Sequence, residues 1–371
     1  MSSDAPFAIS RLALDGVRNL ESATFELEPG INLIVGDNGQ GKTSLLEAIY
    51  IACTTKSFRT ARLREVTAHA RDAFSVRATI SIGHPTLGPI ERDHRVVFTA
   101  RGVRATIDEN PAPSLAQYAV SAPVVVFHAE ELTLSHGPAA ARRRLLDRVA
   151  LYKSPLGAVS AGRYAKALKA RQELLRRGGA GSELDAYEAL LAKFGAELTR
   201  ARRDASEALS GPTLRAFQAI GAPDLVLSIT YRAGGSEDEA DALRELASRR
   251  DRDARSSAAS FGPHRDDLLL GLDGHAVDRV ASQGQHRAIT LALKTAESAT
   301  IHETTGLWPI QLLDDVSSEL DPARTEALFS SLREARGQVF ITSTRGDLLR
   351  GALGAAKAKQ FQVVAGMVQG S

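Results

Sequence analysis

The sequence has a single cysteine, Cys53, among its 371 residues. One thiol excludes an internal disulfide and a metal site built from several cysteines, so a reducing compartment fits this chain. The most apolar run, Val124 to Phe127, is far shorter than the roughly 20 residues of a membrane helix. The first residues also lack the basic and apolar segments of a secretory signal. We therefore expect a cytoplasmic protein with no membrane partner.

Net charge is also small, because 46 Lys and Arg residues face 44 Asp and Glu residues, which leaves +2. Taken alone, this total gives no reason to expect a nucleic-acid partner. Hydrophobic residues make up 43% and charged residues 24%, which excludes wholesale disorder and a collagen-like chain. No repeat at a fixed period occurs, so solenoids and propellers are excluded. A chain of 371 residues predicts two domains, or one large domain with an insertion.

Strand-like and helix-like patterns divide the chain into three stretches. Residues 1–127 are strand-rich, residues 128–260 are mostly helical, and the strand-and-helix pattern returns in residues 261–371. Because the first and third stretches share one pattern, we expect a single α/β domain with a mixed sheet, interrupted by a helical lobe.

The strongest local motif is a glycine-rich turn between a strand-like run at 31–35 and a helical pattern. It matches G-x-x-x-x-G-K-[ST], the loop whose backbone N–H groups and helix N-terminus bind phosphates. We expect Lys42 to reach the β- and γ-phosphates and to act in catalysis, and Thr43 to bind Mg²⁺. A chance glycine-rich turn is the alternative, which the strand and helix on either side disfavour. The candidate nucleotide-binding residues here are Gly36, Asp37, Asn38, Gly39, Gln40, Gly41, Lys42, Thr43 and Ser44.

A second motif follows an apolar run at 310–313 and consists of Asp314 and Asp315. Parallel sheets bind ligands at the carboxyl ends of their strands, so these carboxylates are candidates for the same site. We expect Asp314 to hold Mg²⁺, directly or through water, and Asp315 to polarise the attacking water. Successive strand residues alternate faces, which predicts that the two side chains point in different directions. A solvated turn is the alternative.

Upstream of these acids, Ser282-Gln283-Gly284-Gln285 precedes a helical pattern. A serine caps a helix well, and the free N–H groups of a first turn suit an anion. This tetrapeptide between the two motifs resembles the signature of an ABC-type ATPase head. That resemblance implies that Ser282, Gln283, Gly284 and Gln285 bind the γ-phosphate of ATP held by a second protomer. A plain helix cap is the alternative.

Further blocks narrow the resemblance to the RecF family of bacterial recombination proteins. They span nearly the whole chain: Arg18-Asn19-Leu20, Leu46-Glu47-Ala48-Ile49, Lys56-Ser57-Phe58-Arg59-Thr60, Gly262-Pro263-His264-Arg265-Asp266-Asp267 and Ser318-Glu319-Leu320-Asp321, besides the motifs above. Two departures from the family pattern are Ser44, where an asparagine is usual, and the segment 128–132. This segment leaves open which residue near the helical lobe senses the γ-phosphate.

The resemblance implies positions for four further residues. Arg18 and Asn19 are expected beside the nucleotide, and Asp321 in a loop that crosses a dimer interface. Thr344 stands where transporter heads place a switch histidine.

The resemblance also implies a function, that of a weak, DNA-stimulated ATPase acting as a switch. ATP and Mg²⁺ would close a homodimer on double-stranded or gapped DNA, and slow hydrolysis would release it. The partners implied are RecR, with RecO and RecA, in recombinational repair, replication restart and the SOS response. An ABC-transporter subunit is the alternative, but its usual Leu-Ser-Gly-Gly-Gln and catalytic Glu are replaced here by Ser-Gln-Gly-Gln and Asp315. A structural-maintenance tether would need long heptad arms, which the sequence lacks.

The small net charge hides a local excess. Residues 141–180 hold eleven Lys or Arg residues and two acidic ones, a net charge of +9 against −7 elsewhere. Such a segment is typical of contacts to DNA phosphates without base readout. Because aromatics make up only 5%, duplex DNA or a junction is favoured over stacked single strands. A solvated helix face is the alternative. The candidate contacts are Arg142, Arg143, Arg144, Arg163, Lys166 and Lys169.

Two remaining residues receive simpler interpretations. Cys53 is expected to be a packed core thiol, since no Cys–His pairing supports a nucleophile. His264 either lies near the site or stabilises a turn by a hydrogen bond.

Overall fold

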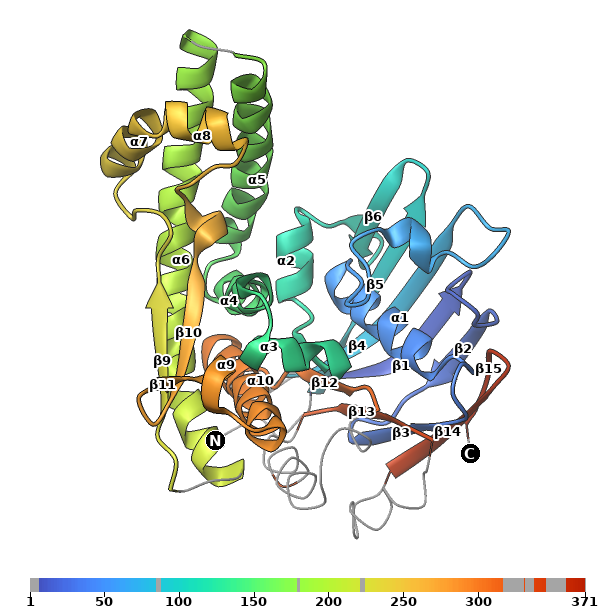
Figure 1. The fold of residues 1–371 in the computed structure, drawn as a ribbon. Helices are drawn as coiled ribbons and strands as arrows, with labels where there is room; N and C mark the ends of the chain where they lie inside the picture. Colours follow the sequence, from blue (N-terminus) through green and yellow to red (C-terminus); the bar gives the residue numbers. More distant parts are fainter. Residues whose placement is uncertain are drawn as a thin grey trace. The chain divides into compact units, whose positions relative to one another are not determined.

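The computed structural model describes residues 7–84, 88–178, 181–220, 224–315, 330, 337–344 and 358–370 (Figure 1). Contacts between residues divide the chain into two compact units. The first unit contains residues 1–131, 219–221 and 301–371, and the second contains residues 132–218 and 222–300. The division at 128 and 261 made from the sequence stays a prediction. The second compact unit, defined by contacts, also includes residues 261–300.

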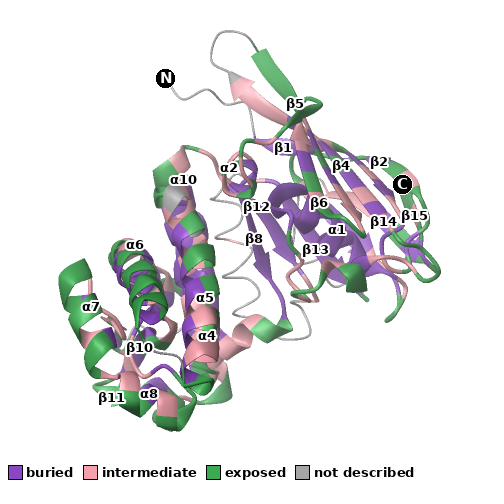
Figure 2. Cartoon of the chain, turned by 90° about the horizontal axis from the view of Figure 1, so that it is seen from above, coloured by how far each residue is buried: buried purple, intermediate pink, exposed green. Residues whose placement is uncertain are grey.

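One sheet of the first unit is parallel except at one edge. Strands β8, β12 and β13 of this sheet are buried along their whole length (Figure 2), which is why they have near-continuous apolar sequences such as Val-Val-Val-Phe in β8. The order of its strands is β15 (Met367–Gly370), β14 (Ala358–Val364), β3 (Ile31–Val35), β13 (Val339–Ser343), β12 (Ile310–Leu313) and β8 (Val124–Phe127). Only β15 runs antiparallel to its neighbour.

A second sheet of the first unit is antiparallel and contains strands from the strand-rich stretch 1–127. Its strand order is β2 (Ala23–Glu26), β1 (Ala8–Asp15), β4 (Phe74–His84), β5 (Gly88–Thr99), β6 (Gly102–Ile107) and β7 (Asn110–Pro111). The alternation of buried and exposed residues along β1 and β5 gives this sheet one core face and one outer face.

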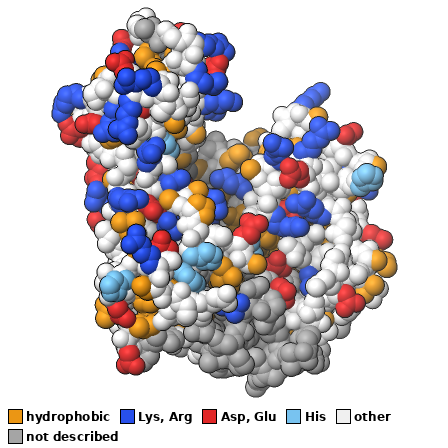
Figure 3. Space-filling model, viewed as in Figure 1, with side chains coloured by type: hydrophobic (Ala, Val, Ile, Leu, Met, Phe, Trp, Pro, Cys, Tyr) orange, Lys and Arg blue, Asp and Glu red, His pale blue; other side chains and the backbone are white. Residues whose placement is uncertain are grey.

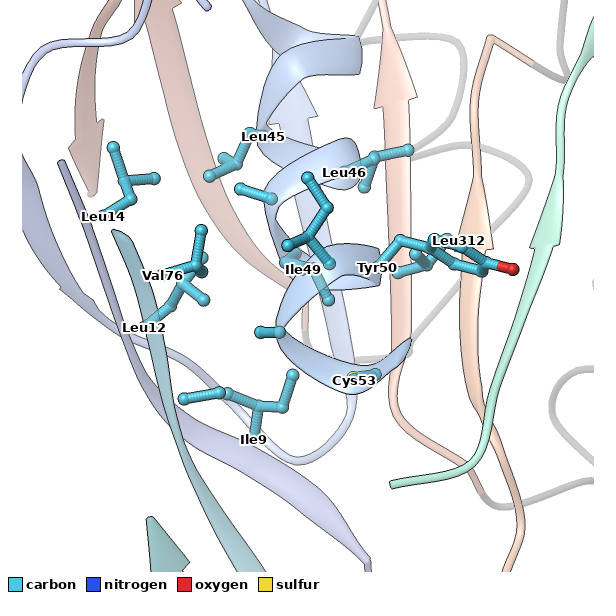
Figure 4. Packing of buried hydrophobic residues seen from close by; sticks show 14 of the residues in the cluster. Ile9, Leu12, Leu14, Leu45, Leu46, Ile49, Tyr50, Cys53, Val76 and Leu312 are labelled. Carbon is cyan, nitrogen blue, oxygen red and sulfur yellow. The ribbon is translucent and has the colours of Figure 1, made fainter. Parts of the chain in front are cut away.

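Helix α1 (Lys42–Thr54) begins at the glycine-rich turn and lies in the core between the two sheets. Leu45 and Ile49 face Leu12 of the antiparallel sheet, while Leu312 lies on the other side of the helix (Figure 4). All but one of its residues are buried, Cys53 among them, which matches the core thiol expected. Burying each large apolar side chain contributes about 1.5–3 kcal/mol, so this core fixes where the helix begins. Short helical segments η1 (Leu63–Val66), α2 (Leu115–Val120) and η2 (Ala129–Leu132) complete the described part.

The second unit is mainly helical, with a small sheet of β11 (His275–Ala276), β10 (Asp267–Leu272) and β9 (Leu227–Arg232). Its long helices pack around a core that includes Tyr164, Leu191 and Leu198. The helices are α3 (Thr133–His136), α4 (Ala139–Lys153), α5 (Pro155–Arg176), α6 (Ser182–Ile220), α7 (Glu239–Ser248), α8 (Arg250–Ser256), η3 (Pro263–Arg265), α9 (Val277–Val280) and α10 (Gln283–Thr305). The last turns of α6 and α10 belong to the first unit. Among the described residues, no helix has the length and apolar character needed to cross a membrane.

Candidate nucleotide-binding site

The glycine-rich turn, residues 36–43, has a backbone path that its glycines make possible. Gly39 and Gly41 have φ angles of 81° and 121°, in the left-handed region that favours glycine. A Cβ atom on Gly36 would lie 2.3 Å from the carbonyl oxygen of Val363 on β14. The loop therefore passes close to a neighbouring strand and opens directly into the N-terminus of α1, where the free N–H groups of the first turn favour an anion.

Lys42 is buried inside this loop. Its Nζ donates to the carbonyl oxygens of Gly36, at 2.6 Å, and Asp37, at 2.9 Å. Burial lowers the pKa of Lys42, and the negative charges of Asp315, Asp314 and Asp37 oppose that shift. The side chain is thus held at the loop, where a phosphate bound by the loop would meet its charge.

Three elements meet at Asp314. The hydroxyl of Thr43, on α1, donates to Asp314 Oδ1 at 3.0 Å, and the hydroxyl of Thr342, on β13, donates to the same oxygen at 2.8 Å. The backbone N–H of Asp315 donates to Thr342 Oγ1 at 2.8 Å. A hydroxyl and a carboxylate side by side are oxygen ligands of the type Mg²⁺ prefers, so Thr43 and Asp314 fit this ion. In the described residues no group of three or more metal-binding side chains occurs, so phosphate and water would supply the other ligands.

The alternation of faces expected for the two acids does not apply to them. Strand β12 ends at Leu313, so neither Asp314 nor Asp315 belongs to a strand. Asp315 instead has a φ angle of 50°, in the left-handed region.

Asn19 and Ser44 join the loop, whereas Arg18 turns to a different partner. Asn19 Nδ2 donates to the carbonyl of Gly39 at 3.2 Å, and Ser44 Oγ donates to Asn19 Oδ1 at 3.1 Å. Arg18 donates from Nε and a terminal nitrogen to the two carboxylate oxygens of Glu47, at 2.8 and 2.9 Å. These bonds raise the pKa of Arg18.

Glu47 was part of a family block in the sequence but was given no role there. It is fully buried on α1, accepts a hydrogen bond from the hydroxyl of Ser57 at 2.5 Å, and forms an ion pair with Arg59 at 3.4 Å. An acidic residue inside an otherwise apolar helix was the available signal, because a buried charge needs partners.

The tetrapeptide at 282–285 lies in the second unit at the start of α10. The N–H of Gln285 donates to Ser282 Oγ at 3.3 Å, and Gln285 Oε1 accepts from the N–H of Ser282 at 2.6 Å. This reciprocal pair is a capping box, so Ser282 caps α10, and the γ-phosphate contact of the tetrapeptide stays a prediction. Ser282 and Gln283 are exposed, and the N–H groups of Gln283 and Gly284 lie in the first turn, where a helix offers them no backbone acceptor.

The remaining expected residues occupy varied positions. Thr344 is exposed directly after β13, and Asp321 lies outside the described residues. His128 is buried with its ring 5.1 Å from that of Phe58. His264 stabilises a turn: one ring nitrogen lies 2.8 Å from the Tyr164 hydroxyl and the other 3.0 Å from the carbonyl of Ala259.

Many arginines of the basic segment 141–180 are neutralised within the second unit. Arg142 forms two hydrogen bonds with Asp267 and its side chain is 13% exposed, while Arg143 donates to the carbonyl of Asp266. Arg148 pairs with Glu297 at 2.6 Å. The net charge of the segment therefore overstates what faces solvent, and Figure 3 shows Asp and Glu among the Lys and Arg there. The candidates that are exposed are Arg144, Arg163, Lys166 and Lys169.

A second basic surface was missed because its residues are spread along the sequence. The outer face of the antiparallel sheet holds a hollow of about 940 Å³ lined by Arg77, Arg95, Arg101 and Arg104, with three acidic residues. Arg77 and Arg95 are directly opposite each other on β4 and β5. Like charges in such positions are destabilising, and Asp93 offsets only one of them, at 2.6 Å from Arg77. An anionic partner would favour this arrangement.

Comparison with known proteins gives the following matches. The family model described as RecF/RecN/SMC N terminal domain matches residues 8–367. The DNA replication and repair protein RecF of Anaeromyxobacter sp. (strain Fw109-5) is 38% identical over 368 residues, covering 96% of this chain and 97% of that protein. RecF of Geobacter sulfurreducens is 35% identical over 350 residues, covering 92% and 94%.

Solved structures agree with these matches. A structure of the recombination mediator protein RecF-ATPrS in the RecFOR pathway has a TM-score of 0.87 and 26% identity, and covers 100% of both chains. An Smc head domain from Pyrococcus furiosus has a TM-score of 0.54 at 14% identity, covering 98% of this chain and 96% of that one, which shows similarity of fold alone.

Proposed function

The chain belongs to the RecF family, and we propose that it binds ATP at the loop 36–43 and acts in DNA replication and recombinational repair. The resemblance found in the sequence is thereby confirmed, as is the α/β ATPase-head fold with a helical lobe. The family assignment disfavours the alternative function, that of an ABC-transporter subunit. Relatives named as replication and repair proteins, and RecF structures with ATP or ATPrS, support the proposal.

The site residues divide the work of a phosphoryl-transfer site. The loop N–H groups and Lys42 bind the phosphates, while Thr43 and Asp314 hold Mg²⁺. When bound, this ion neutralises charge on the phosphates during transfer. Asp315 orients the attacking water, and Asn19 and Ser44 hold the loop through their hydrogen bonds.

A second copy of the chain completes the site. Residues 282–285, of which Ser282 and Gln283 are exposed, present the N-terminus of α10, whose first-turn N–H groups suit a γ-phosphate bound by the partner. ATP would therefore favour a homodimer in which Asp321 and Thr344 lie near the interface. Slow hydrolysis, stimulated by DNA, would release it, which makes the ATPase a weak enzyme and a switch. The RecFOR pathway named for the solved relatives supports RecR and RecO as partners. RecA, and DNA gaps or junctions as the place of action, are proposed from the family resemblance alone.

The hydrogen bond between Thr43 and Asp314 carries this proposal, because it joins the two motifs into one site. The test is Lys42→Ala, with molecular mass measured with and without Mg-ATP and DNA. We expect loss of ATP binding and of the ATP-dependent mass increase. Lys359→Ala is the control, since Lys359 lies at the start of β14 and pairs with Glu28 at 3.9 Å. An ATP-dependent dimer that survives Lys42→Ala would contradict the mechanism.

The DNA surface requires its own test. We propose that Arg144, Arg163, Lys166 and Lys169 bind phosphates; Arg142 and Arg143 are set aside because acceptors of the second unit bind them. Removing one side chain that neutralises a phosphate should reduce the slope of log K against log salt by about 0.9. The triple alanine variant of Arg163, Lys166 and Lys169 should therefore lower it by about 3. If alanine at Arg95, Arg101 and Arg104 lowers the slope instead, the DNA lies on the antiparallel sheet.

A further inference from the structure

The C-terminal hairpin of β14 and β15 is bonded to the middle of the phosphate-binding loop. At its turn, the N–H of Ala365 donates to Gln40 Oε1 at 2.5 Å. The N–H of the next residue, Gly366, donates to the carbonyl oxygen of Gln40 at 3.0 Å. Gln40 thus accepts two backbone hydrogen bonds from a segment that follows it by more than three hundred residues.

The same turn is bonded to the segment that contains Asn19. The carbonyl of Gly366 accepts from the N–H of Glu21 at 3.1 Å. Gly366 is buried with a φ angle of 85°, and a Cβ atom there would lie 2.0 Å from the carbonyl oxygen of Asn19. Asn19 in turn donates from its side chain to Gly39. Hairpin, Asn19 segment and loop therefore form a closed set of contacts, which requires glycine at position 366.

We propose that the turn at Ala365 and Gly366 is a positioning element of the nucleotide site, acting through Gln40. The motif leaves position 40 open to any residue, so the phosphates do not require this side chain. Its amide oxygen is instead bound by the hairpin, which holds the loop in place before a nucleotide arrives. A loop that is ordered in advance loses less conformational entropy on binding, so affinity rises without a new contact to the ligand. This inference rests on the proposed ATP site.

The test is Gln40→Met, which keeps the side-chain length and removes the acceptor. We expect ATP and ADP to bind more weakly by the same factor, about three- to tenfold, the value of one hydrogen bond. The factor is the same for both because the turn orients the loop and does not contact the γ-phosphate. Titration calorimetry on the full chain measures both affinities. Gln369→Met is the control, because Gln369 lies on β15 opposite Gln362 rather than at the turn.

A second variant, Gly366→Ala, tests the same interaction from the hairpin side. Its larger clash should weaken both nucleotides more than Gln40→Met does. Gly274→Ala is its matched control: Gly274 has a φ angle of 80° in another hairpin turn, and a Cβ atom there meets nothing within 4 Å. If Gly366→Ala fails to fold, Gln40→Met decides alone.

The outcomes separate this inference from the proposed function. Equal weakening of ATP and ADP, with an unchanged melting temperature, supports the positioning role. Unchanged affinities in Gln40→Met, or a lower melting temperature without an affinity change, would overturn it. If Gln40→Met leaves the affinities unchanged but Lys42→Ala abolishes ATP binding, the ATP site is supported and only the role of the hairpin is wrong. Binding that survives Lys42→Ala would refute the ATP site itself.

Discussion

A substitution at Arg171 can distinguish a structural charge of the basic segment from a charge that is proposed to bind DNA. Its side chain is fully buried, and it donates to Glu188 at 3.0 Å, to Asp253 at 2.7 Å and to the carbonyl of Leu246 at 3.0 Å. In Arg171→Met, Glu188 keeps a cation because Arg250 also pairs with it. Asp253 keeps, among the described residues, only the N–H of Ser260 as a donor to its carboxylate.

Removing one partner of a buried ion pair costs about 3–5 kcal/mol. Since Glu188 remains paired, we expect about 3 kcal/mol for Arg171→Met, or roughly a hundredfold larger open population of the helical unit. Hydrogen exchange of α5, α6 and α8 amides in the full chain measures this opening. Adding Asp253→Asn should recover part of the stability, because it removes the unpaired charge.

The control is Lys169→Met, an exposed position on the same helix. It should change the opening free energy by less than about 0.5 kcal/mol and lower the salt slope of DNA binding by about 0.9. Arg171→Met should leave that slope unchanged. The reasoning from burial is refuted if Arg171→Met opens the helices no more than Lys169→Met does.

Three further outcomes are expected. Burial lowers the pKa of His94 to about 4. As pH falls from 6.5 to 4, the unfolded chain therefore binds a proton at His94 before the folded chain does, and the free energy of unfolding should drop by up to about 3 kcal/mol. Urea titrations of His94→Gln should lack this part of the drop. Burial raises the pKa of Cys53 to about 12, so iodoacetamide should label it only after unfolding, and labelling of the native chain at pH 8 would argue against the core position. Gly36→Ala should abolish ATP binding because its Cβ meets Val363, whereas Gly30→Ala, in open space, should bind ATP normally in the same calorimetric assay.

The family and the two halves of the proposed ATP site could be predicted from local sequence patterns. Each motif lies within a few residues of a strand end, so the local sequence pattern is enough to predict it. The phosphate-binding loop is marked by a strand, a glycine-rich turn and a helix, and the acid by an apolar run that ends just before Asp314. The basic segment was also visible as a count of charges.

Which residues meet depends on how distant parts of the chain fold together. Thr43 and Asp314 are 271 positions apart in the sequence, and parallel pairing of distant strands brings them to one edge. The role of Gln40 depends on a hairpin at the other end of the chain. Whether an arginine is a surface charge or a buried pair depends on carboxylates from other elements, as for Arg171 and Asp253. Composition records how many charges a segment has, whereas folding decides which of them water and DNA can reach.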